Sequence, residues 1–154
     1  MTTVGTAGRA SSEIIGGEIV ASVDIASPPE RVFRAISSDE IVSWWVRPGV
    51  FDTREWSGDV RVGGRWRASG TARGAPYTLE GEYIEVDPPR KLVHTWWNVA
   101  NPDAISTVTY LLLQIPSGTR LTVRHVGIQI PEIAKGTNDG WECSLRRLVE
   151  ILGA

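Results

Sequence analysis

Cysteine is nearly absent from this sequence, and the single residue, Cys143, rules out a disulfide within the chain. An unpaired thiol fits a reducing compartment. The first residues, MTTVGTAGRASSEIIGG, lack the apolar segment of a signal peptide, and no later run is long enough to span a bilayer. We therefore expect a cytoplasmic protein without membrane insertion.

An excess of charge of either sign is also missing. The formal net charge is -2 and the pI is about 5.7, so there is no electrostatic basis for binding nucleic acid. The sequence contains no G-x-S-x-G, no H-E-x-x-H, no P-loop and no dinucleotide-binding fingerprint. We expect no nucleic-acid partner and no cofactor.

The length of 154 residues is enough for one domain with a real core. Residues 1–16 are small, polar and rich in glycine, which predicts a flexible N-terminal extension. Residues 17–154 contain no inner linker and no repeat, and we assign them to a single domain.

The order of elements predicts an α+β fold. EIVASVDI alternates as a first strand, and SPPERVFRAI and SSDEIVSWWV predict two short helices, the first capped by Ser27. Strands and turns follow as far as residue 128, and their short connections favour antiparallel neighbours. TNDGWECSLRRLVEIL is a final amphipathic helix with an apolar stripe that contains Trp141 and Leu145. A curved antiparallel sheet of about seven strands wrapped on this long C-terminal helix is a helix-grip arrangement.

Several segments together resemble a known family. VDIASPPERVFRAI, the pair Trp44 and Trp45, GDVRVGGRWR, EGEYIEVDPPRKLVHTW and GTRLTVRH are similar to bacterial homologues of the C-terminal domain of the activator of the heat-shock protein 90 ATPase. That family belongs to the START-related, Bet v 1-like (SRPBCC) superfamily. The resemblance covers roughly residues 19–152. One position departs from it: His94 stands where the family's strand leads us to expect an aromatic residue.

The resemblance implies a cavity between the sheet and the terminal helix that usually holds an apolar molecule. Its motifs are poor guides to activity, because the superfamily includes lipid carriers, polyketide cyclases, resistance proteins and co-chaperones. It supplies no catalytic set that matches this sequence residue by residue. The eukaryotic activators carry an additional domain that engages the chaperone, and we expect no such domain in this chain.

Strand parity predicts a row of polar rings inside the sheet. In KLVHTWWN, His94 shares a face with Leu92 and Trp96, and in RLTVRHVGI His125 lies opposite the charged face. Pairing Leu112 with Val123 across the short turn then places Tyr110 beside His125, and matching faces place it beside His94.

This row has two interpretations. It is either a satisfied polar layer in the core or a patch that orients a ligand in an apolar pocket. We assign no catalytic residues. We also expect no metal site, since two histidines lack the further ligands that zinc needs.

The strand YTLEGEYIEV leaves its parity open. Either Glu80 and Glu82 face the interior, which brings a carboxylate near Trp96, or Tyr83 and Glu85 do.

Seven tryptophans suggest a roomy aromatic interior. We expect Trp45, Trp56 and Trp97 to be partly exposed. The residues expected to line the cavity are Trp44, Trp66, His94, Trp96, Tyr110, Leu112, Val123, His125, Trp141 and Leu145.

The sequence thus favours non-catalytic binding of a small hydrophobic or aromatic molecule in a cavity. The alternatives are a co-chaperone-like protein interaction in the stress response, and a cyclase- or hydrolase-like enzyme that uses the polar row. The ligand's identity and the oligomeric state stay open, and a homodimer is compatible with the sequence.

Overall fold

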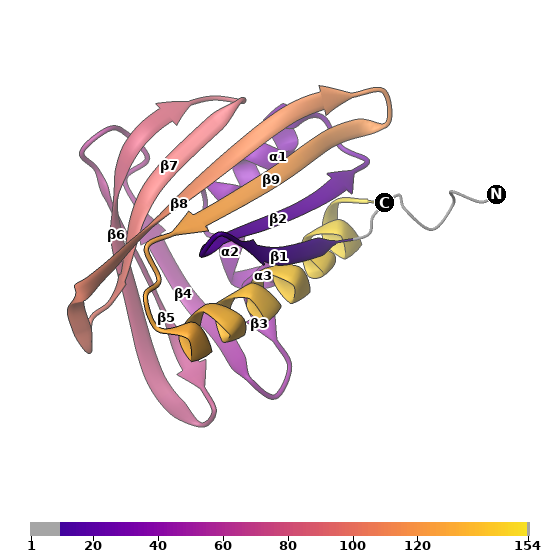
Figure 1. Cartoon of the computed structure of the whole chain (residues 1–154). Coiled ribbons are helices and arrows are strands. Elements are labelled where there is room, and N and C mark those ends of the chain that lie inside the picture. The colour runs from indigo at the N-terminus through magenta and orange to yellow at the C-terminus, as the bar shows by residue number, and fades with distance from the viewer. Residues whose placement is uncertain (1–9, 154) are drawn as a thin grey trace.

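The computed structural model describes residues 10–153 and contains one curved antiparallel sheet and three helices in that range (Figure 1). The strands are β1 (Ser11–Ile15), β2 (Glu18–Ile25), β3 (Val46–Arg47), β4 (Phe51–Gly58), β5 (Arg65–Ala72), β6 (Ala75–Asp87), β7 (Lys91–Asn98), β8 (Asn101–Ile115) and β9 (Gly118–Val126). The helices are α1 (Pro29–Ile36), α2 (Ile41–Trp44) and α3 (Pro131–Leu152).

The strands form one sheet in the order β1-β2-β9-β8-β7-β6-β5-β4-β3. From β3 to β9 each strand pairs with its neighbour in sequence, and β2 closes the order by pairing with β9. The sheet curves, and α3 lies along its concave side (Figure 1). The predicted helix-grip fold, with two short helices after β2 and a long C-terminal helix, is confirmed.

The sheet has nine strands in the described residues rather than about seven. The expected flexible extension is wrong for Ser11–Ile15, which form β1 and pair with β2 through the turn at Gly16 and Gly17. Those two glycines have positive φ angles of 59° and 83°, as a tight hairpin turn requires. Residues 1–9 of the expected extension lie outside the described part. The assignment of residues 17–154 to one domain stays a prediction.

Helix α3 begins at Pro131, six residues before the predicted start at Thr137. Its other end is tied to the segment between β2 and α1. The Ala26 amide donates to the Gly153 carbonyl oxygen at 3.0 Å, and Ser27 Oγ donates to the Leu152 carbonyl oxygen at 2.7 Å. The expected capping of α1 by Ser27 is therefore wrong, because this hydroxyl holds the C-terminal end of α3 instead.

Gly136 of α3 and Gly153, which follows the helix, differ in backbone conformation and surroundings. A Cβ added at Gly136 meets nothing within 4 Å, and the residue lies within a regular helix. We expect Gly136→Ala to raise the free energy of unfolding by about 0.5–1 kcal/mol, because alanine loses less backbone entropy in a helix. Urea denaturation measures this change. Gly153→Ala is the matched control and should destabilise, since its φ of 113° disfavours any side chain.

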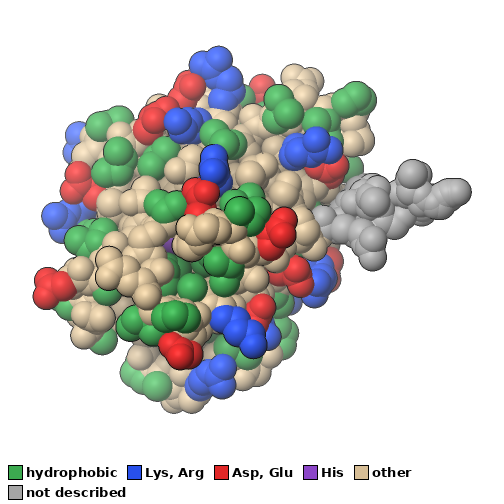
Figure 2. Space-filling model, viewed as in Figure 1, with side chains coloured by type: hydrophobic (Ala, Val, Ile, Leu, Met, Phe, Trp, Pro, Cys, Tyr) green, Lys and Arg blue, Asp and Glu red, His purple; other side chains and the backbone are tan. Residues whose placement is uncertain are grey.

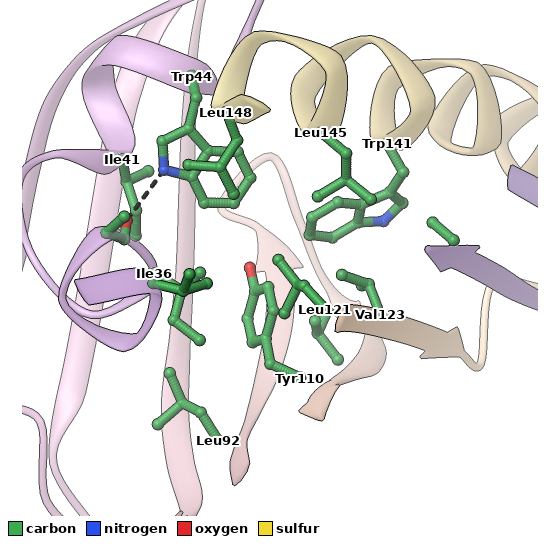
Figure 3. Packing of buried hydrophobic residues seen from close by; sticks show 14 of the residues in the cluster. Ile36, Ile41, Trp44, Leu92, Tyr110, Leu121, Val123, Trp141, Leu145 and Leu148 are labelled. Carbon is green, nitrogen blue, oxygen red and sulfur yellow. Dashed lines mark hydrogen bonds between the residues drawn. The ribbon is translucent and has the colours of Figure 1, made fainter. Parts of the chain in front are cut away.

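The core lies between the sheet and α3. Trp141, Leu145 and Leu148 project from α3 toward the sheet, and the Tyr110 hydroxyl points back toward the helix (Figure 3). Trp44 joins the core from α2 and donates its indole N–H to the Ala35 carbonyl oxygen at 2.9 Å. All five side chains are less than 5% exposed, so the centre of this core is closely packed.

The surface in Figure 2 shows basic and acidic side chains intermixed, with no continuous area of one sign on that face. Within residues 10–153, no helix is long and apolar enough to cross a membrane.

Candidate functional site

A pocket of about 530 Å³ lies between the N-terminal half of α3 and strands β3 to β7. We call it the indole pocket. Its lining contains Trp45, Arg47, Val50, Phe51, Thr53, Ala72, Arg73, Tyr77, Leu79, Trp96, Asn98, Ile133, Gly136, Thr137, Gly140, Trp141 and Ser144. Its volume falls in the range of about 300–1,000 Å³ that is typical of small-molecule sites.

Three of the lining residues are tryptophans, and we call them the indole triad: Trp45, Trp96 and Trp141. They come from the residue after α2, from β7 and from α3. The ring centroids of Trp45 and Trp96 are 5.1 Å apart, those of Trp96 and Trp141 are 6.0 Å apart, and those of Trp45 and Trp141 are 6.4 Å apart. The triad presents a rigid aromatic wall built from three separate elements.

A chain of hydrogen bonds links two members of the triad through His125. Trp141 Nε1 donates to His125 Nδ1 at 3.0 Å, so the proton of the neutral imidazole lies on Nε2. That nitrogen donates to Ser106 Oγ at 2.7 Å, and Ser106 donates to the Trp96 carbonyl oxygen at 3.3 Å. Both imidazole nitrogens are occupied, and His125 therefore fixes the position of the Trp141 ring.

The environment of His125 favours the neutral form that these hydrogen bonds require. Burial is the main cause that lowers its pKa to about 3, and the nearby His94 contributes to the same shift. A proton on Nδ1 would also face the Trp141 N–H, which is itself a donor. His125 is thus a positioning residue with no free nitrogen for proton transfer.

His94 is also buried, but its hydrogen bond is more easily replaced. Its Nδ1 donates to the Thr95 carbonyl oxygen at 2.9 Å, and the same oxygen accepts the Trp66 indole N–H at 3.2 Å. Burial lowers the pKa of His94 to about 4, and the bond to Thr95 opposes this shift. If His94 were lost, the Thr95 oxygen would keep a partner.

Two buried polar atoms beside the pocket have no hydrogen-bond partner among the described residues: Trp45 Nε1 and the Tyr110 hydroxyl. Burial raises the pKa of Tyr110 well above its ordinary value, Tyr83 raises it as well, and the Trp45 indole lowers it. An unpaired buried polar group costs about 1–3 kcal/mol. The Trp45 indole N–H and the Tyr110 hydroxyl are therefore incompletely satisfied polar groups beside the pocket.

The predicted register of the polar row is wrong, although its face is right. Tyr110 lies opposite Val123, and His125 lies opposite Val108, two residues from the predicted pairing. The turn from β8 to β9 contains only two residues between the paired Ile115 and Gly118, which shifts the register. A shift of two residues keeps every side chain on its face, so both rings still point inward and are at most 1% exposed.

The ten side chains expected to line the cavity divide into two groups. Trp96 and Trp141 line the indole pocket. The others form the packed core beside it and do not line this pocket: Trp44, Trp66, His94, Tyr110, Leu112, Val123, His125 and Leu145. They were expected in a cavity because they face inward, but large rings fill that part of the interior.

Sequence reasoning missed Trp45, which is 4% exposed rather than partly exposed and contacts four other tryptophans. It lies just after α2, where strand parity gives no information. Trp56 and Trp97 are partly exposed as predicted. The adjacent pair of tryptophans was the available signal, because both rings pack inward from one short helix.

The open parity of β6 is resolved by a bulge. Tyr83 pairs with His94 and is 2% exposed, whereas Ile84 is 50% exposed and Glu85 pairs with Val93. Glu80 pairs with Arg67 on the outer face at 3.3 Å, and Glu80 and Glu82 do not line the indole pocket. The extra residue at the bulge reverses the faces, so no single parity describes the strand.

Residues 26–153 match the family described as Activator of Hsp90 ATPase homolog 1-like protein. The match confirms the resemblance inferred from the sequence. No curated protein matches this chain.

Solved bacterial structures share the fold. Protein CV1439 from Chromobacterium violaceum is 24% identical with a TM-score of 0.80, covering 91% of this chain and 99% of its own. Protein Ms6760 from Mycobacterium smegmatis is 19% identical with a TM-score of 0.77, covering 94% and 96%. The AHSA1 protein from Silicibacter pomeroyi is 24% identical with a TM-score of 0.72, covering 88% and 96%. At these identities the likeness shows the fold.

Proposed function

Because this chain belongs to the family of Activator of Hsp90 ATPase homolog 1-like proteins, whose fold commonly binds hydrophobic ligands, we propose that it binds one small apolar or aromatic molecule in the indole pocket. The proposal assigns binding and no reaction. The observation that carries it is the indole triad, which presents three aromatic rings to a pocket of about 530 Å³.

The shape of the wall favours a flat ligand. Adjacent rings of the triad are inclined at 42° and 52°, so their faces and edges surround one space from different directions. The triad is also held in place from behind, since His125 fixes Trp141 and Trp66 packs on Trp45 with ring centroids 5.7 Å apart. A preformed wall lowers the entropic cost of binding.

A few polar groups among the apolar ones give such a pocket directional contacts. Thr53 and Tyr77 form a hydrogen bond between their hydroxyls in the lining. Burial raises the pKa of Tyr77, and the bond to Thr53 opposes this. Asn98 and Ser144 add an amide and a hydroxyl. Sparse polar groups in an apolar lining are the usual composition of a small-molecule site.

We expect the neutral fluorescent probe N-phenyl-1-naphthylamine to bind saturably, with a Kd of about 1–10 μM, and to quench tryptophan emission. Gly140→Leu and Ala72→Leu add bulk from opposite walls of the pocket, α3 and β5. Each should weaken binding by about tenfold or more. Fluorescence titration measures the affinity, and thermal melts establish that each variant is folded.

Lys135→Leu is the control, because it adds the same side chain to α3 at an exposed position outside the pocket lining. Its affinity for the probe should equal that of the original protein. The proposal is wrong if the probe does not bind saturably, or if folded variants with either wall filled bind it as well as the control does.

A further inference from the structure

The charged side chains in the lining of the indole pocket are both arginines, Arg47 and Arg73. Most other arginines of the described chain form ion pairs: Arg31, Arg34, Arg54, Arg61, Arg67, Arg90, Arg120, Arg124 and Arg146. Neither pocket arginine pairs with a carboxylate between residues 10 and 153. The pocket therefore holds two positive charges without an acidic partner.

The backbone places both arginines at the same end of the pocket. Arg47 lies in β3 and pairs with Phe51, and Phe51 pairs in turn with Ala72, the residue before Arg73. The Arg73 amide donates to the Val50 carbonyl oxygen at 2.8 Å, which ties the β5–β6 turn to the β3–β4 turn. Strand β3 and the neighbouring β5–β6 turn thus present one guanidinium each.

The turn that carries Arg73 uses an uncommon backbone conformation. Arg73 has a φ of 50°, and Gly74 follows with a φ of 81°, as in a two-residue hairpin turn with both central residues left-handed. Asparagine, aspartate and glycine are the preferred residues there. An arginine at this position projects its side chain from the tip of the hairpin, where it is exposed to solvent and still contributes to the pocket lining.

From these observations we infer that the ligand is an apolar acid: an aromatic or otherwise apolar body on the indole triad, with one carboxylate at Arg47 and Arg73. A guanidinium binds a carboxylate with two parallel hydrogen bonds, and the partly buried Arg47 offers them beside an apolar surface of low dielectric constant. This inference rests on the proposed function, since it names the class of molecule that the same pocket takes.

Two probes with the same aromatic skeleton, one neutral and one anionic, separate the contributions of the apolar part and of the negative charge to the binding affinity. 1-Anilinonaphthalene-8-sulfonate is N-phenyl-1-naphthylamine with an added sulfonate, a monoanion that stands in for the carboxylate. We expect Arg47→Gln and Arg73→Gln to weaken binding of the sulfonate probe about three- to tenfold each, and the double variant more. Binding of the neutral probe should change less than about twofold. Raising NaCl from about 0.05 to about 0.5 M should weaken binding of the sulfonate probe alone.

Arg90→Gln is the matched control, because Arg90 is exposed in the turn after β6, at the end of the strand away from the pocket. It should leave both affinities unchanged. The inference is overturned if the double variant binds the sulfonate probe as well as the original protein, or loses both probes equally. Binding of the neutral probe would then still support the proposed function, whereas failure of both probes on the original protein would remove both proposals.

Discussion

Acidification from about pH 6.5 to about pH 4.5 should lower the free energy of unfolding by about 4 kcal/mol. His94 and His125 are neutral in the folded protein, and burial lowers their pKa values from 6.5 to about 4 and about 3. Between these values and 6.5 the unfolded chain binds two protons that the folded protein does not. The stability is thus fully present above pH 6.5 and is lost as the pH falls, by about 1.4 kcal/mol per pH unit for each histidine.

Urea denaturation at a series of pH values measures this slope, provided that the dependence on urea stays constant. His94→Phe removes one titrating group and should reduce the slope by about half. A stability that is flat between about pH 6.5 and about pH 5 would show that the two imidazoles do not stay neutral in the folded state.

His125→Phe is expected to destabilise the protein by about 2–4 kcal/mol. The substitution leaves the Trp141 N–H without its acceptor and removes the donor to Ser106, both inside the core. We also expect weaker binding of N-phenyl-1-naphthylamine, because the ring of Trp141 is no longer held against the pocket. Chemical denaturation gives the first quantity, and fluorescence titration gives the second.

His94→Phe serves as the comparison for His125→Phe, in both stability and probe binding. There the Thr95 oxygen keeps the Trp66 indole N–H, so we expect His94→Phe to cost about 1 kcal/mol or less and to leave probe binding unchanged. Equal stability losses at the two positions would contradict the distinct roles assigned to the histidines.

Much of this architecture could be predicted from the sequence, because strands and helices place side chains on their faces with a regular period. Alternation in KLVHTWWN and RLTVRHVGI was sufficient to place His94 and His125 on the inner face, where both are buried. The apolar stripe of the last helix likewise identified Trp141 and Leu145 as core residues. The face of a side chain depends on its own strand or helix alone, which is why these predictions hold.

The features that could not be predicted from the sequence are the pocket boundary, the bulge in β6 and the register of β8 with β9, and each depends on contacts between different segments. The pocket boundary follows from which rings pack against one another, and inward-facing residues such as Leu112 and Val123 do not show that in advance. The Tyr83–Glu85 bulge reverses a face within one strand, and the two-residue turn after Ile115 sets a register. Each is a local irregularity that only the paired strand reveals.

The pairing of β2 with β9 has a consequence for how the chain reaches its native state. Ile19 pairs with His125 and Ile25 pairs with Thr119. Strand β2 is synthesised early and β9 near the end of the chain, so β2 cannot pair with β9 until most of the chain has been made. Within residues 10–153, β9 is the only strand outside the β1–β2 hairpin that pairs with it. Contacts so distant along the chain require the closure of a large loop before they contribute stability, and proteins dominated by them fold over about milliseconds to seconds. Until β9 leaves the ribosome, the edge of β2 that pairs with it in the native sheet has no native partner, and an unpaired strand edge is a site of pairing with other chains.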